Sequence, residues 1–119
     1  MPRTLLADVA AHPAAGSTAA RRFVDQLIWR EFYADVLWAN PHSAWQDLRA
    51  LALRYDEPQD AIDAWRKGRT GYPIIDAGMR QLREVGWMHN RVRMITASFL
   101  TKDLHVWWPT GARWFLDRL

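Results

Sequence analysis

The chain has 119 residues, of which 50% are apolar and 24% charged, and its formal net charge is +3. This length allows one modest core, and the balance of apolar and charged residues excludes a disordered chain. The sequence has no cysteine, which excludes disulfides, thiolate nucleophiles and cysteine-ligated metals. The four histidines lack the spacing and the carboxylate neighbours of a metal site, so we predict none. No apolar run approaches the roughly 20 residues of a membrane span, so we expect no membrane association.

Every long segment has the pattern of a helix and none alternates like a strand, so the predicted fold class is all-α. Helices are predicted over residues 2–9, 18–39, 58–68, 73–85 and 88–104, and a short one follows Pro109-Thr110. Residues 42–56 are ambiguous, with one short helix expected around 44–53. We expect Ser17 or Thr18 to cap the helix over 18–39, and Gly86 to follow the end of the helix over 73–85.

The helix predicted over residues 18–39 carries two different stripes. One recurs every fourth residue and is apolar, which predicts a core-facing side: Val24, Ile28, Phe32 and Val36. The other combines polar and aromatic side chains, which is unusual for a plain solvent face: Gln26, Trp29, Arg30 and Tyr33. The eight tryptophans of the chain allow two interpretations, core filling or a role in stacking and redox chemistry.

The helix predicted over residues 88–104 also divides into two sides. Val92, Ile95 and Phe99 are spaced to face the core. The opposite side gathers an amide, a guanidinium, a thioether and a small residue, with Arg91 and Ser98 on its flank: Asn90, Arg93, Met94 and Ala97. This side is either a solvated basic face or a surface that admits a large ligand.

Three segments, residues 29–33 (WREFY), 70–82 (TGYPIIDAGMRQL) and 86–104 (GWMHNRVRMITASFLTKDL), resemble the central motifs of the DNA photolyase/cryptochrome family in the same order. The resemblance is strongest to bacterial photolyases that repair cyclobutane pyrimidine dimers. It implies that residues 1–119 are a fragment of a single helical FAD-binding domain. In that family FAD lies in a cavity that opens onto a basic DNA-binding surface, and a pyrimidine dimer is flipped out of the duplex into the cavity.

The resemblance implies contacts with the damaged DNA for four residues. Trp29 matches the tryptophan that stacks against the dimer, and Arg91 and Met94 match residues that contact the dimer or its surroundings. Asn90 matches a residue at the edge of the flavin ring that also reaches toward the dimer, so we expect it to take part in catalysis. A flat aromatic side chain suits an extruded base, because stacking contributes roughly 1–3 kcal/mol per base.

The resemblance also implies a flavin pocket, which Asn90 shares with one amide, two guanidinium groups and an indole: Gln26, Arg30, Arg93 and Trp87. A reduced flavin anion and its phosphates both favour fixed cationic donors in a partly dry site. The match therefore agrees with the two stripes, which group Trp29 with Arg30, and Asn90 with Arg93 and Met94.

Trp108 matches the middle member of the tryptophan chain that reduces the flavin in light, although a packing residue beside Trp107 is the alternative interpretation. The sequence departs from the family at several positions. Gln26 stands where glutamate is usual, Tyr55 falls near the surface end of the electron chain where tryptophan is usual, and Pro109 replaces a basic residue. An amide at position 26 removes a charge from the cavity but keeps its capacity for hydrogen bonds.

The resemblance predicts a light-driven, FAD-dependent lyase that splits pyrimidine dimers by electron transfer, the activity of deoxyribodipyrimidine photo-lyases. The alternatives are a cryptochrome-type blue-light photoreceptor and an inactive truncated remnant with at most weak nucleic-acid binding. The type of lesion and the antenna chromophore stay open. The family's phosphate-binding loop, acidic flavin motif and N-terminal α/β antenna domain are absent from these 119 residues, so we expect the isolated chain to bind FAD weakly or not at all. For the complete protein we expect a cytoplasmic monomer.

Overall fold

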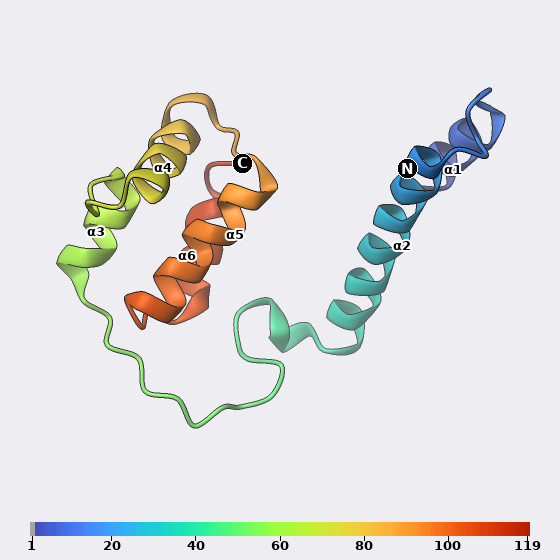
Figure 1. Cartoon of the computed structure of the whole chain (residues 1–119). Helices are drawn as coiled ribbons and strands as arrows, with labels where there is room; N and C mark the ends of the chain where they lie inside the picture. The colour runs from blue at the N-terminus through green and yellow to red at the C-terminus, as the bar shows by residue number, and fades with distance from the viewer. Residues whose placement is uncertain (1) are drawn as a thin grey trace. The chain divides into compact units, whose positions relative to one another are not determined.

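The computed structural model describes residues 2–119, and no strand occurs among them, which confirms the all-α class. The helices are α1 (Pro2–Ala11), α2 (Thr18–Ala39), α3 (Gln59–Lys67), α4 (Pro73–Val85), α5 (Asn90–Ser98) and α6 (Trp108–Leu116) (Figure 1). A 3-10 turn, η1 (Pro41–Ala44), follows α2, and a π turn, η2 (Phe99–Asp103), continues α5. The chain divides into two compact units, Met1–Ala50 and Leu51–Leu119. Within the described residues no helix is both long and apolar enough to cross a membrane.

The first unit is a pair of helices, in which α1 folds back on α2 through the loop over residues 12–17. The bounds of α2 are those predicted, because both ends are marked locally. The Ser17 hydroxyl accepts a hydrogen bond from the backbone N–H of Ala20 at 3.1 Å, which confirms the predicted N-cap. At the other end Asn40 donates its backbone N–H to Val36 O, and Pro41 follows.

The predicted core-facing stripe of α2 is wrong for its two central members, because Ile28 is 60% and Phe32 51% exposed. Leu27 is the buried residue of this helix instead. The reason is one of length: α1 has 10 residues and α2 has 22, so α1 spans about 15 Å and can cover less than half of a helix about 33 Å long.

The prediction of a helix around residues 44–53 is also wrong. The only regular structure there is η1, which ends at Ala44. A helix this short is marginal in water and depends on packing of its apolar side chains. Leu48, Leu51 and Leu53 are all exposed, so no such packing supports one.

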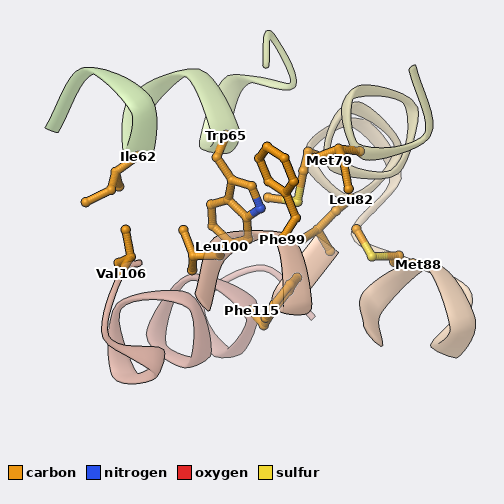
Figure 2. Close-up of a cluster of buried hydrophobic side chains, with 10 residues drawn as sticks. Ile62, Trp65, Met79, Leu82, Met88, Phe99, Leu100, Val106 and Phe115 are labelled. Atoms are coloured by element: carbon orange, nitrogen blue, oxygen red, sulfur yellow. The ribbon is translucent and has the colours of Figure 1, made fainter. Parts of the chain in front are cut away.

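The second unit has the core of the molecule, formed by buried side chains from α3, α4, η2, α6 and the segments before α5 and α6, with partly buried residues of α5 packed against it (Figure 2). Trp65 of α3 is completely buried and contacts Phe115 of α6 edge to face, with ring centroids 5.6 Å apart. The helix predicted over 58–68 is α3, which starts one residue later because Pro58 is its N-cap. The helix predicted over 73–85 is α4, followed by Gly86 with a φ of 65°, as predicted.

The helix predicted over residues 88–104 is present as α5 and η2 together, beginning at Asn90 and ending at Asp103. Val92 and Phe99 pack in the core as predicted. Ile95 does not, since it is 40% exposed, and Thr96 is completely buried in its place. Thr96 fits there because its hydroxyl donates to Arg93 O at 3.0 Å, which satisfies the buried polar atom.

Candidate functional site

The polar and aromatic stripe of α2 forms an exposed surface on the first unit. Trp29 and Tyr33, one turn apart, stack with ring centroids 6.0 Å apart and an interplanar angle of 28°. Phe32 meets Trp29 edge to face at 5.7 Å. Trp29 is 53% exposed, so one part of its indole is held by aromatic neighbours and another part is open for contact.

The two polar members of the stripe are exposed as well. Arg30 pairs with Glu31 through Nη1 and Oε1 at 3.0 Å, and Gln26 lies one turn before it. Because both side chains of the ion pair are more than half exposed, the pair contributes little and can be exchanged for a bound anion.

The predicted ligand-facing side of α5 lies on the second unit and starts at the first turn of the helix. His89 is the N-cap, and its Nδ1 accepts from the backbone N–H of Arg91 at 3.1 Å. The Asn90 amide contacts the Met94 sulfur at 3.8 Å, which joins these two side chains one turn apart. Asn90, Arg91 and Met94 are exposed, so an amide, a guanidinium and a flexible thioether are available at one end of the helix.

Arg93 is the partly buried member of this surface. Its Nη2 donates to Met88 O at 3.3 Å, which holds the guanidinium against the start of the helix. Its Nε is buried and has no hydrogen-bond partner. Arg66 Nε is buried without a partner too, but the Arg66 guanidinium also pairs with Asp63 at 3.5 Å and lies over the Trp114 ring. A buried donor without an acceptor costs stability. Arg93 as a whole is only half-buried, so a ligand can reach the rest of its guanidinium.

Trp87 lies in the connection between α4 and α5 and is exposed. Its ring meets the His89 ring at 6.4 Å in a T-shaped arrangement. It therefore presents an indole three residues before Asn90, on the same unit as Arg93.

Trp108 is the first residue of α6 and is half-buried. The ring before it, Trp107, lies 6.3 Å from the Tyr55 ring, with an interplanar angle of 37°. Next to this pair Asp56 donates its backbone N–H to His105 O at 3.0 Å, and its Oδ2 lies 3.2 Å from His105 Nδ1. These contacts attach the segment before α3 to the segment before α6, so Tyr55 lies beside Trp107 rather than free in a linker.

Outside the predicted site, Asp76 in the first turn of α4 has a buried carboxylate. Its carboxylate accepts from Thr70 N at 2.7 Å, Thr70 Oγ1 at 2.6 Å and Gly71 N at 3.0 Å. Burial disfavours its charge, but these hydrogen bonds and the charge of Arg80 outweigh burial and hold the pKa of Asp76 below its ordinary value. The carboxylate thus fixes the loop that precedes α4.

The structure places the predicted site residues in two groups. Gln26, Trp29 and Arg30 belong to the first unit, and the remaining members belong to the second: Trp87, Asn90, Arg91, Arg93, Met94 and Trp108. Two buried residues that support the second group, Trp65 and Thr96, were not predicted from the sequence, and they are joined by a hydrogen bond at 3.0 Å. They are 31 positions apart, so no local pattern could have paired them.

Comparison with known proteins shows the family of the chain. Residues 23–119 match the family model of the FAD binding domain of DNA photolyase. The deoxyribodipyrimidine photo-lyase of Streptomyces griseus is 51% identical over 104 residues, which cover 87% of this chain and 23% of that protein. The corresponding protein of Halobacterium salinarum is 52% identical over 99 residues, covering 82% of this chain and 21% of that protein.

Solved structures give the same result. A class III photolyase from Agrobacterium tumefaciens superposes with a TM-score of 0.88 at 38% identity, covering 99% of this chain and 25% of its own. A Synechocystis cryptochrome superposes with a TM-score of 0.92 at 32% identity, with the same two coverages. The chain thus spans about a quarter of the length of the proteins it matches. It belongs to the family of the FAD-binding domain of DNA photolyases.

Proposed function

We propose that this chain is part of the FAD-binding domain of a light-driven DNA repair lyase that splits pyrimidine dimers. The observation that carries the proposal is the half-buried guanidinium of Arg93, held against Met88 O, beside the exposed Asn90 and Met94 on one end of α5. The family supports the same assignment, since its curated members in Streptomyces griseus and Halobacterium salinarum are deoxyribodipyrimidine photo-lyases.

The residues present fit FAD, and we assign its binding to Gln26, Arg30, Trp87, Asn90 and Arg93. The accessible part of the Arg93 guanidinium would donate to an acceptor of the cofactor, and the Asn90 amide can both donate and accept at the ring edge. Arg30 is held only by an exposed ion pair, so its guanidinium group is available for a phosphate. Trp87 supplies an exposed apolar wall.

Bound and reduced FAD supplies light-driven electron donation to the dimer. The chain contributes orientation and electrostatics. Trp29 would stack on an extruded pyrimidine, supported from one side by Tyr33 at 6.0 Å. Arg91 and Met94 would contact the dimer, through a charge for phosphate or carbonyl oxygens and through a polarisable sulfur. We assign electron transfer through the protein to Trp108. The partner is therefore damaged DNA, and we propose a monomer that works in the cytoplasm.

A chimaera tests the proposal. This chain replaces the matching quarter of the Streptomyces griseus photo-lyase, with which it shares 51% identity over 104 residues. We expect the chimaera to purify with bound FAD and to repair dimer-containing DNA only in light. An Arg93→Ala version should lose FAD, because it removes the cationic donor. A chimaera that folds but neither binds FAD nor repairs DNA would refute the proposal and leave the chain as an inactive remnant.

Trp29→Ala separates the two ligands. In the chimaera we expect this change to weaken binding of dimer-containing DNA by roughly 1–3 kcal/mol, through loss of one stacking surface, while FAD is retained. Trp38→Ala is the matched control, because Trp38 lies on the same helix and is 87% exposed outside the stripe. Equal losses in the two variants, or loss of FAD with normal DNA binding in Trp29→Ala, would contradict the assignment.

A cryptochrome-type photoreceptor is the second candidate, favoured by the TM-score of 0.92 to the Synechocystis cryptochrome. It predicts a chimaera that binds FAD and responds to light without repairing dimers. Light-dependent repair therefore distinguishes the two functions directly.

A further inference from the structure

Two side-chain donors lie within hydrogen-bond distance of three consecutive backbone carbonyls at the end of α5, those of residues 96–98. The Trp65 indole donates its Nε1–H to Thr96 O at 3.0 Å. The Thr101 hydroxyl lies 3.1 Å from Ala97 O and 3.3 Å from Ser98 O, and it can donate to either. These carbonyls directly precede the π turn η2. Side chains therefore supply two hydrogen-bond donors at the point where the helix changes its pitch.

The hydrogen bonds of the backbone change at the same point. The N–H of Phe99 is shared between the carbonyls of Ile95 and Thr96, and the N–H of Leu104 donates to Phe99 O, five residues back, at 3.1 Å. A π turn holds one more residue than an α-helical turn, and such turns commonly lie near functional sites. Insertion of a side-chain donor into the ladder is an established cause of such irregularities.

The donors come from inside the molecule. Trp65 projects from α3 into the core beside Leu100 and Phe99, and it is completely buried (Figure 2). Thr101 belongs to η2 itself and is half-buried. The edge-to-face contact with Phe115 holds the Trp65 ring in the orientation in which its indole N–H donates to Thr96 O.

The π turn decides how the chain continues toward α6. One extra residue rotates everything that follows by about 100° relative to an uninterrupted α-helix. Directly after it, His105 has a φ of 51°, and Val106 donates its N–H to Leu100 O at 3.1 Å and is completely buried. Trp108 then begins α6. The place of Trp108 relative to Arg93, on the same unit, therefore depends on η2.

We propose that Trp65 and Thr101 are positioning residues, whose hydrogen bonds to the carbonyls of residues 96–98 hold the π turn and thereby fix where Trp108 lies. The functional meaning of this placement rests on the proposed role of Trp108 in electron transfer. The placement itself is a property of the chain and needs no cofactor.

Thr101→Val in the 119-residue chain is the decisive variant, because it keeps the shape of the side chain and removes its donor. We expect the backbone amides of Leu104 and Val106, which close the turn, to exchange with deuterium roughly three- to tenfold faster. The amide of Gly86, bonded to Leu82 O at the end of α4, should not change. Thr101→Ser should restore slow exchange. Thr110→Val is the control, since among the described residues the hydroxyl of Thr110 makes no hydrogen bond.

The position of Trp108 is followed by the NMR signal of its indole N–H, assigned with Trp108→Phe. We expect this signal to shift in Thr101→Val and to return in Thr101→Ser, with no shift in Thr110→Val. Trp65→Phe should shift it in the same direction, because phenylalanine keeps a ring in the core but has no N–H to donate.

Two results would overturn the inference: unchanged exchange of Leu104 and Val106 in Thr101→Val, or altered exchange with an unmoved Trp108 signal. If Trp65→Phe does not fold, the threonine variants still decide the question. Failure of the chimaera to bind FAD would refute the proposed function without affecting these measurements, so the two failures are distinguishable.

Discussion

The two units of the chain keep their shape in different ways. In the second unit ten apolar side chains, from α3, α4, α6, η2 and the segments before α5 and α6, form one buried cluster. In the first unit Leu27 is the buried residue of α2, and large side chains such as Trp29, Tyr33 and Trp38 are exposed. Arg93 thus stands on a helix fixed by a core, whereas Trp29 is held by aromatic neighbours on its own helix. We infer that the residues of α5 proposed to face the flavin are preorganised by packing, and that those proposed on α2 depend on what they bind.

The largest effect on stability is expected from a pair of methionine truncations that test this comparison. Met79→Ala should lower the free energy of unfolding by about 2–5 kcal/mol, because it removes a completely buried side chain and leaves a cavity. Met94→Ala, at a site 56% exposed, should change it by less than about 0.5 kcal/mol. Urea denaturation followed by circular dichroism measures both. Similar losses would show that the second unit has no tightly packed core.

Gly78→Ala tests how closely α4 and α5 approach each other. A Cβ at position 78 would collide with Cγ1 of Val92, so we expect a loss of about 1–3 kcal/mol from overpacking. Gly16→Ala, where nothing lies within 4 Å, should be close to neutral. The double variant Gly78→Ala with Val92→Ala should recover part of the loss. A neutral Gly78→Ala would mean that the two helices are not in tight contact.

Asp76→Asn tests the loop before α4 and its dependence on pH. It should cost about 1–3 kcal/mol at pH 7, because charge-assisted hydrogen bonds from Thr70 and Gly71 are weakened. The pKa of Asp76 is lowered by folding, so its stabilisation is complete above the ordinary carboxyl pKa of about 4 and is lost as the pH falls through the lowered value.

The free energy of unfolding, measured between pH 7 and pH 2, tests whether stability falls with pH in this way. Asp76→Asn should flatten the fall in stability at acid pH, whereas Asp35→Asn, on an exposed part of α2, should leave it as in the parent chain. A variant with the parent's acid profile would contradict the assigned role of Asp76.

The smallest effect belongs to the first unit. Ser17→Ala removes the N-cap of α2 and should cost about 1 kcal/mol of stability for that helix. Ser43→Ala in η1 is the control, because among the described residues its hydroxyl makes no hydrogen bond. Helix content at 222 nm during thermal unfolding measures the difference. If Ser17→Ala matched the control, packing of α1 rather than the cap would hold the start of α2.

The predictions that succeeded rest on local chemistry. Ser17, Asn40-Pro41, Pro73 and Gly86 mark helix ends through hydrogen bonds and φ angles that involve only near neighbours, so the bounds of α2 and α4 were predictable. The motifs in residues 29–33, 70–82 and 86–104 identified the family for the same reason, because side-chain identity and spacing are enough to match a pattern.

Burial, by contrast, depends on which other segments each helix packs against. Ile28 and Ile95 have the spacing of core residues but are exposed, and Thr96 is buried although it is polar. Periodicity describes one helix, whereas burial depends on a second surface, and the hydrogen bond from Trp65 to Thr96 crosses 31 residues. The residues alone therefore establish the helices, the family and the candidate ligand-facing side chains. Only the tertiary structure establishes the burial of Thr96 and its hydrogen bond from Trp65 next to the π turn, because that contact joins segments far apart in the chain.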